Sequence, residues 1–397
     1  MTAWLHVIGI GEDGWNGLRP AAHSALQGAE VIIGGDRHHG LVPELGAERI
    51  AWPSPFRAML DEVTNLRGRK VAILVTGDPL WFSAGRYFVD IFGPDEVAFH
   101  PQLSAFQLAA IEMKWSLADV ETLTVHGRPS AQIVPYFAEG VRLLVLTEDA
   151  GSPSEIAGLL TAHGFGRSTM TVLGALGGPS QCRISGTAAT WQADSPDFHV
   201  LAVECRAEQD ALLLPRIGLP DDAFEHDGKM TKRDVRAATV TALDPRRGQL
   251  LWDIGTGCGS VAVEWMRAAP DAVAIGIDAE APRLEMARKN ANRLGAPRLK
   301  LLQGHVPNAL EGLDRPNAVF LGGGLSLETV RAAKAALLPR GRLVANAVTL
   351  ESETLLAACQ SDYGGELVRL SVSRAVEVGH MRGWRPAMPV TQWRLYT

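Results

Sequence analysis

The chain has 397 residues, which predicts two or three domains of ordinary size. Hydrophobic residues make up 46% and charged residues 21% of the sequence, as in globular proteins that fold around their own cores. The net charge of −6 and the lack of a long basic run argue against a nucleic-acid partner. No apolar stretch approaches the roughly 20 residues that cross a bilayer, and the N-terminus does not resemble a signal peptide. We therefore expect a cytoplasmic protein with no membrane partner.

The cysteines are scattered along the chain and form no C-x-x-C pair. They are Cys182, Cys205, Cys258 and Cys359. This spacing predicts free thiols in a reducing compartment. His38 and His39 are adjacent in the sequence, and neighbours on a helix or strand do not share a face. We predict no metal site, and we expect these two histidines at the surface or against a substrate.

A glycine-rich loop follows the first expected strand, residues 4–8. Gly9, Gly11 and Gly14 match the G-x-G-x-x-G pattern of dinucleotide sites letter for letter. Glu12 and Asp13 lie within the loop, where a pyrophosphate would need a positive field. The acids disfavour phosphate binding, although a flavin- or NAD-dependent oxidoreductase remains an alternative at this point.

The rest of the first half alternates expected strands and helices. Helices are expected at 18–27 and 55–66, and strands at 30–33, 70–76, 122–126, 141–147, 169–173 and 199–204. The strand at 70–76 ends in Gly77-Asp78-Pro79, a sharp turn. Open α/β sheets bind ligands at the carboxyl ends of their strands. This turn is therefore a candidate binding loop.

Residues 1–208 resemble the tetrapyrrole (class III) methyltransferases. The matching stretches are 7–11, 77–79 and Pro101-Gln102-Leu103-Ser104-Ala105, with Thr124-Val125-His126-Gly127-Arg128 as a subfamily signature. The resemblance implies a two-lobed α/β domain that binds S-adenosylmethionine (SAM) between its lobes and presents the first glycine loop, with Gly9 and Gly11, to a tetrapyrrole. The implied SAM-binding residues are Gly77, Asp78, Leu80, Ser104 and Ala105. A glutamate usual in the family is absent from 176–181, which leaves the role of that segment open.

A linker is expected at 209–225, where two prolines and two acids interrupt any periodicity. The second domain then spans 226–397. Thr231 is a suitable helix N-cap, with Asp234 three residues later in a pattern like a capping box.

The second domain contains the clearest functional signal of the chain. The apolar strand 250–254 leads into a loop with Gly255, Gly257 and Gly259, and a helix follows. The next apolar strand ends at Asp278, about 20 residues beyond the last glycine. In such a βαβ unit the terminal carboxylate accepts hydrogen bonds from ribose hydroxyls. The pattern predicts a nucleoside-binding site.

The G-x-G-x-G spacing after Asp253 resembles motif I of the class I methyltransferases, which have a Rossmann-like fold and bind SAM. The resemblance implies a second set of SAM-binding residues in this chain. They are Thr231, Gly255, Thr256, Gly257, Cys258, Gly259, Asp278 and Val306. Many class I enzymes have Asp where His305 stands, so only a backbone contact at Val306 is carried over.

Further strands are expected at 299–302, 318–321 and 341–348, and the tail from 365 supplies the last ones. The triglycine after the fourth strand replaces the Asn/Asp-Pro-Pro-Tyr motif of amino-group methyltransferases and leaves room for a bulky, flat acceptor. A tetrapyrrole acceptor also carries carboxylates that need cations. The candidate substrate-binding residues of this domain are Lys229, Gly322, Gly323, Gly324, Arg374 and Arg382.

The two modules in this order resemble the decarboxylating precorrin methyltransferases of corrin biosynthesis. The resemblance implies SAM-dependent methylation of C5 by the first domain, methylation of C15 by the second, and loss of carbon dioxide from the C12 acetate. It also suggests that the second domain forms homo-oligomers. Other readings are a methyltransferase of another tetrapyrrole, an RNA-modifying methyltransferase, and a tetrapyrrole carrier that consumes no SAM.

Overall fold

The computed structural model describes residues 3–53, 56–209, 211 and 213–397. It divides into two compact units, which are described separately. Unit 1 comprises 1–130 and 136–211, and unit 2 comprises 131–135 and 212–397. Within the described ranges, no helix has the length and apolar character needed to cross a membrane.

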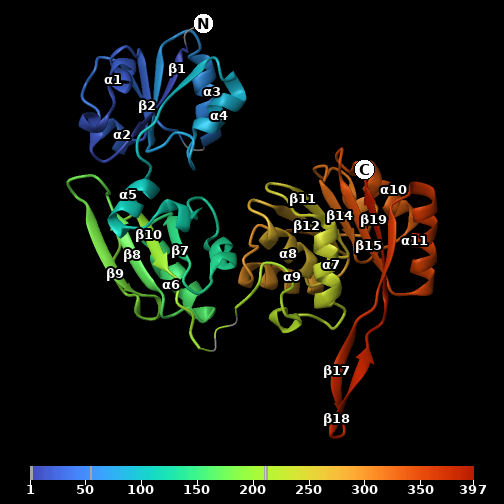
Figure 1. The fold of residues 1–397 in the computed structure, drawn as a ribbon. Helices are drawn as coiled ribbons and strands as arrows, with labels where there is room; N and C mark the ends of the chain where they lie inside the picture. Colours follow the sequence, from blue (N-terminus) through green and yellow to red (C-terminus); the bar gives the residue numbers. More distant parts are fainter. Residues whose placement is uncertain (1–2, 54–55, 210, 212) are drawn as a thin grey trace. The chain divides into compact units, whose positions relative to one another are not determined.

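Unit 1 begins with a parallel sheet in the order β3-β2-β4-β1-β5 (Figure 1). Its strands are β1 (Leu5–Ile10), β2 (Val31–Gly34), β3 (Glu48–Ala51), β4 (Val71–Thr76) and β5 (Val97–His100). The accompanying helices are η1 (Gly14–Gly17), α1 (Pro20–Gln27), α2 (Asp36–Gly40), α3 (Phe56–Asn65) and α4 (Gly85–Phe92). Helices α3 and α4 cover one face and α1 the other. The central strands are therefore continuous apolar runs.

A second sheet in unit 1 is mixed, in the order β6-β7-β10-β8-β9. Its strands are β6 (Glu121–Thr124), β7 (Arg142–Leu146), β8 (Thr169–Gly174), β9 (Cys182–Thr187) and β10 (His199–Glu204). The helices are α5 (Ala105–Met113), η2 (Leu117–Asp119), η3 (Ser130–Tyr136), α6 (Ser152–Ala162) and η4 (Ala188–Thr190). Apolar residues of α5, including Phe106 and Ala109, pack against this sheet. The expectation of two α/β lobes is confirmed.

Unit 2 is built on a seven-stranded sheet in the order β13-β12-β11-β14-β15-β19-β16. Its strands are β11 (Leu250–Ile254), β12 (Val273–Asp278), β13 (Lys300–Gln303), β14 (Ala318–Leu321), β15 (Arg342–Ala347), β16 (Glu366–Leu370) and β19 (Val390–Tyr396). The first five strands are parallel, and β19 runs antiparallel between β15 and β16. The chain order reverses at β11, which places the loop after this strand at a switch point where open sheets bind ligands.

Helices cover both faces of this sheet. They are η5 (Asp221–Ala223), α7 (Arg233–Leu243), α8 (Ser260–Ala268), α9 (Ala281–Arg293), η6 (Asn308–Leu310), α10 (Leu327–Ala336) and α11 (Leu350–Tyr363). One core joins α7 and α8 to the strands, and the other joins α10 and α11 to the opposite face. The Rossmann-like expectation is confirmed.

The structure differs from the sequence-based expectation in part of the C-terminal tail and at the start of α7. The hairpin of β17 (Ser373–Val378) and β18 (Met381–Pro386) is a separate two-stranded sheet that projects from unit 2 (Figure 1). The expected N-cap at Thr231 is wrong, because α7 begins at Arg233 with Lys232 as its N-cap. The Asp221 carboxylate accepts the Arg233 N–H at 2.9 Å and so supplies the bond that a capping side chain would have made.

The segment 213–225 is a packed part of unit 2, although 209–225 was expected to be a linker; Asp210 and Leu212 lie outside the described residues. We call residues 213–225 the strap. Its apolar residues Leu219, Ala223 and Phe224 are buried in one core cluster with Cys258 and Met230. The packing has no helical or strand periodicity, since the strap is irregular apart from η5.

Candidate functional site

The glycine loop of unit 2 connects β11 to α8. All three glycines have positive φ, +70° at Gly255, +54° at Gly257 and +79° at Gly259. Residues other than glycine rarely adopt this backbone conformation. Helix α8 starts at Ser260, directly after the loop, so its N-terminal N–H groups face the end of the sheet.

Glycine is required at two positions of this loop for different physical reasons. A Cβ at Gly255 would lie 2.5 Å from the Gly323 backbone, so these two loops pack glycine against glycine. A Cβ at Gly257 would meet no atom within 4 Å. Packing therefore explains Gly255, whereas Gly257 borders open space in which a ligand would contact the backbone.

Asp278 ends β12 beside this open space. Its Oδ2 accepts the Gly257 N–H at 2.9 Å, and its Oδ1 accepts the Glu280 N–H at 3.0 Å. A carboxylate has about four lone-pair positions, so each oxygen can accept a further bond. Asp278 thus both orders the loop and retains the capacity to hold ribose hydroxyls, as its position in the sequence predicts.

Asp253 lies beneath the loop and is almost fully buried. Its Oδ2 accepts hydrogen bonds from Thr256 Oγ1 at 2.8 Å and from the Ala262 N–H at 3.0 Å. Its Oδ1 is buried and has no hydrogen-bond partner within the protein. Burial raises the pKa of the Asp253 carboxyl to about 6, against the lowering effect of these two hydrogen bonds. Asp253 thus orders the glycine loop from beneath through Thr256 and Ala262, and its Oδ1 keeps an unused acceptor position inside the fold.

This carboxyl predicts a pH dependence of stability. Because its pKa is higher in the folded protein than in the unfolded chain, the carboxyl destabilises the fold once it ionises. Its contribution should lower the free energy of unfolding of unit 2 by about 2–3 kcal/mol as the pH rises from about 4 to 6. Denaturant unfolding at several pH values measures the slope, and Asp253→Asn should remove it. An identical slope in both proteins would contradict the assignment.

The predicted acceptor-binding glycines of unit 2, Gly322, Gly323 and Gly324, follow the carboxyl end of β14. Gly323 packs against Gly255, and a Cβ at Gly324 would lie 2.8 Å from Val306. The triglycine thus lies between the glycine loop and Val306, which brings together three of the predicted segments. Beyond β15, Val348 and Leu350 are 50% and 78% exposed. An exposed apolar surface at this edge suits a flat, conjugated ligand.

The three predicted cations are exposed side chains outside the glycine loop. Lys229 is exposed, and its backbone N–H donates to Asp227 Oδ1 at 3.0 Å. Arg374 and Arg382 lie on the projecting hairpin β17–β18, where Arg374 pairs with Asp234 at 2.6 Å. The structure therefore places two of the three cations on the hairpin, where they are exposed.

In unit 1 the structure brings the predicted loops together at the ends of β1 and β4. A Cβ at Gly9 would lie 1.8 Å from the Gly77 carbonyl oxygen, and a Cβ at Gly77 would lie 3.0 Å from Ser104 Cα. Three backbones thus meet at distances that admit only glycine at the crossings. Gly11 follows in the same loop, where a Cβ would lie 2.6 Å from Asp13 Oδ1.

The remaining predicted SAM residues of unit 1 surround this crossing. Asp78 Oδ1 accepts the Leu80 N–H at 2.8 Å, which fixes the turn and leaves Leu80 55% exposed. Ser104 caps α5 in a reciprocal arrangement with Gln107, and Ala105 is the first residue of that helix. The Gly77 turn and the start of α5 therefore lie next to each other at the carboxyl ends of the first sheet's strands.

Sequence reasoning missed the partner of the acidic first loop. Arg37, just after β2, forms an ion pair with Glu12, donates to Thr76 Oγ1, and stacks over the Phe198 ring at 4.1 Å. The loop charge at Glu12 is thus offset by a cation that no sequence pattern links to it. The loop leads into η1, and α1 begins only at Pro20, so no long helix N-terminus faces the loop as a dinucleotide site requires.

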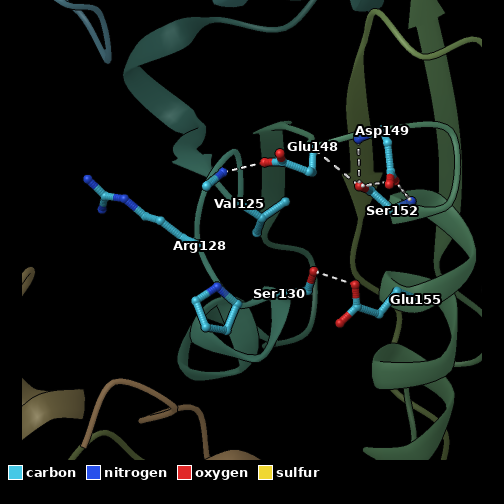
Figure 2. Close-up of a pocket in the computed structure, with 9 residues that line it drawn as sticks. Val125, Arg128, Ser130, Glu148, Asp149, Ser152 and Glu155 are labelled. Carbon is cyan, nitrogen blue, oxygen red and sulfur yellow. Dashed lines mark hydrogen bonds between the residues drawn. The ribbon is translucent and has the colours of Figure 1, made fainter. Parts of the chain in front are cut away.

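A cavity of about 300 Å³ lies at the carboxyl ends of β6 and β7, next to the start of α6. Figure 2 shows that its acids are held by neighbours: Glu148 accepts the Gly127 N–H, and Glu155 accepts the Ser130 hydroxyl. Asp149 caps α6 through the N–H groups of Gly151 and Ser152. Gly127 and Arg128 of the subfamily signature thus line a polar pocket, whose lining includes none of the predicted SAM residues. Among the described residues, no group of three or more His, Cys, Asp or Glu could hold a metal ion.

Two family models match the chain. Residues 4–191 match the tetrapyrrole (corrin/porphyrin) methylases, and residues 222–397 match a precorrin methyltransferase domain. A protein from Sinorhizobium named precorrin-6Y C(5,15)-methyltransferase [decarboxylating] is 43% identical over 397 residues, which is 99% of this chain and 96% of that protein. The chain belongs to the precorrin-6Y C5,15-methyltransferase (decarboxylating) family.

Shorter relatives of the family correspond to parts of the chain. The cobalt-precorrin-7 C(5)-methyltransferase of Salmonella typhimurium is 30% identical over 42% of this chain and 83% of its own. A probable cobalt-precorrin-6B C(15)-methyltransferase (decarboxylating) of Pyrobaculum calidifontis is 37% identical over 41% of this chain and 87% of its own. The two methyl transfers named in the full-length family are therefore also named in separate proteins of about half the length.

Proposed function

We propose that this chain methylates precorrin-6B at C5 and C15 with SAM, removes the carboxylate of the C12 acetate as carbon dioxide, and so forms precorrin-8X in cobalamin biosynthesis. The observation that carries the proposal is the site of unit 2, where Gly257 borders open space and Asp278 accepts its N–H. Membership of the family supplies the substrate class.

The residues of unit 2 fit SAM. Gly257 leaves the backbone accessible, and Asp278 has lone pairs for the ribose hydroxyls. SAM supplies a methyl group already activated by its sulfonium. The protein's task is then alignment of the acceptor carbon with that methyl group, and alignment alone can contribute several kcal/mol.

The acceptor side of unit 2 is open and apolar. Gly322–Gly324 present backbone without side chains, and Val348 and Leu350 add exposed apolar surface. A flat macrocycle would lie here with its C15 and C12 edges toward the glycine loop. On decarboxylation, the electrons of the breaking carbon–carbon bond enter the conjugated ring system, and a proton replaces the carbon dioxide.

In unit 1 the crossing of Gly9, Gly77 and Ser104 supports a second SAM site with the acceptor against Gly9 and Gly11. We assign C5 methylation to this unit and C15 methylation with decarboxylation to unit 2; the names of two shorter relatives likewise assign the two reactions to separate proteins. The roles of Lys229, Arg374 and Arg382 toward substrate carboxylates remain predictions of this assignment.

We also propose that unit 2 forms homo-oligomers through hairpin β17–β18. An isolated two-stranded hairpin is marginal in water, and this one exposes large apolar side chains, with Met381 78% and Trp384 76% exposed. Trp384→Ser together with Met381→Ser should convert the oligomer to a monomer in light scattering. The state of the cysteines bears on a different question, the cellular location. All four are free and three of them are buried, which supports a reducing cytoplasmic location.

The proposed function is tested by calorimetric titration of the full chain with SAM. We expect two sites per chain, of which Asp278→Ala removes one, while Asp362→Ala, an exposed carboxylate on α11, removes neither. Mass spectrometry of the product should show two added methyl groups and one lost carbon dioxide. Binding of NADH without SAM, or tetrapyrrole binding without SAM turnover, would contradict the proposal.

The crossing at Gly9 predicts an effect confined to C5 methylation. Gly9→Ala would drive a Cβ into the Gly77 carbonyl and displace the predicted SAM turn of unit 1. The product should then lack one methyl group but still show the loss of carbon dioxide. Gly158→Ala, at an exposed glycine of unit 1 that, like Gly9, has no positive φ and whose Cβ position has no atom within 4 Å, is the matched control. Complete C5 methylation by Gly9→Ala would count against the assigned site.

A further inference from the structure

We infer that Asn290 is a positioning residue for the SAM site of unit 2, because it locks the glycine loop to the strap. This inference rests on the proposed function, in which the glycine loop holds SAM. Asn290 lies on α9 and is fully buried, and its side chain reaches the predicted SAM-binding residues through the Cys258 carbonyl.

Both polar atoms of the Asn290 side chain, Nδ2 and Oδ1, form hydrogen bonds with the loop or the strap. Its Nδ2 donates to the Cys258 carbonyl at 2.9 Å and to the Glu225 carbonyl at 2.8 Å. Its Oδ1 accepts the Glu225 N–H at 2.9 Å. One amide thus joins the middle of the glycine loop to the C-terminal end of the strap.

The loop would be less constrained without this amide. Cys258 lies between Gly257 and Gly259, two residues with high backbone freedom, and conformations with negative φ are open to both when their neighbours are released. Asp278 fixes Gly257 from one side. Asn290 fixes Cys258 from the other, so the two contacts together select one loop conformation before a ligand arrives. Preorganisation of this kind raises affinity by lowering the ordering cost of binding.

The strap is anchored independently at its other end. Arg267 donates to the Pro215 carbonyl at 3.0 Å and to the Leu294 carbonyl, and the carboxylate of Glu264 accepts the N–H groups of Gly218 and Leu219. The hydrogen bonds of Arg267 go to the strap and to the end of α9 rather than to the glycine loop. It therefore separates an effect on the loop from an effect on strap stability.

The test uses the full chain with Asn290→Ala, Asn290→Asp and the control Arg267→Met. Asn290→Asp keeps the size and the bond from Glu225 but loses both donated bonds at neutral pH. In the ligand-free protein we expect amide hydrogen exchange of residues 255–261 to become at least tenfold faster in both Asn290 variants. SAM affinity at the unit 2 site should fall about tenfold, while the unit 1 site stays unchanged. Arg267→Met should loosen 213–217 and leave the loop exchange and the SAM affinity as in the wild type.

The outcomes separate two failures. Wild-type loop exchange in both Asn290 variants would overturn the inference whatever SAM does, and so would equal loosening of the loop by Arg267→Met. Faster loop exchange with unaltered SAM affinity would also overturn it, since the lock would then not position the site. A wild-type protein with no SAM site in unit 2 would instead refute the proposed function, while the exchange data would still report whether Asn290 orders the loop.

Discussion

Gly255→Ala is expected to abolish SAM binding and C15 methylation in unit 2 while C5 methylation continues. The alanine Cβ would lie 2.5 Å from the Gly323 backbone, and the residue would also have to adopt φ near +70°. Overpacking typically costs about 1–3 kcal/mol and an unfavourable φ about 1 kcal/mol more. We therefore expect unit 2 to lose about 2–4 kcal/mol in denaturant unfolding, and the glycine loop and the triglycine to separate.

A matched substitution isolates the contact between the two loops. Gly312 has φ +72° but no atom within 4 Å of its Cβ position, so Gly312→Ala tests the backbone strain alone. It should cost about 1 kcal/mol and leave SAM affinity unchanged in calorimetry. An equal loss of SAM binding in both variants would show that packing of Gly255 against Gly323 is not what holds the site.

Arg236→Met should destabilise unit 2 by about 3–5 kcal/mol, because it leaves the buried Glu264 carboxylate without its cation. Both side chains are fully buried, and Arg236 Nε lies 2.6 Å from Glu264 Oε1. Arg236 also donates to the carbonyls of Leu219 and Thr231. The substitution therefore removes the bond that ties the strap and the predicted SAM turn at Thr231 to α7.

A double variant and a variant of an exposed ion pair serve as controls for Arg236→Met. Arg236→Met with Glu264→Gln removes both charges and should be more stable than Arg236→Met alone, since no unpaired charge remains buried. Arg246→Met breaks the exposed pair with Asp244 and should change the free energy of unfolding by less than about 1 kcal/mol. A large effect at Arg246, or a double variant weaker than the single, would contradict the account of the buried pair.

Much of the fold follows from apolar strand runs and the turns that end them. The strand leading to Gly77 is aliphatic up to Thr76, the strand leading to Gly255 is apolar apart from Asp253, and their loops lie where the motifs indicate. The strap escaped prediction because its buried residues belong to no regular element, so their spacing has no period to recognise. The N-cap at Thr231 was misplaced because a carboxylate twelve residues earlier in the chain than Arg233 supplies the bond.

Local patterns predicted the site's backbone better than its polar partners. Glycine spacing indicates where a backbone must turn or approach a ligand, and Asp278 follows its strand at the expected distance. The ion pair of Arg37 with Glu12, and the bonds of Asn290 to Cys258 and Glu225, join residues 25 to 65 positions apart. Such pairings depend on how the elements pack, which a single sequence does not encode in any short-range signal.

The different surroundings of Gly255 and Gly257 imply that the two glycines would drift differently in a population of variants. A selection that demands only a folded protein would reject almost every change at Gly255, because the clash is with another backbone. The same selection would accept Asn or Asp at Gly257, which tolerate its left-handed φ and would extend into empty space. Only a selection that requires methyl transfer would hold Gly257 constant, so the pair records folding and chemistry as separate constraints within three residues.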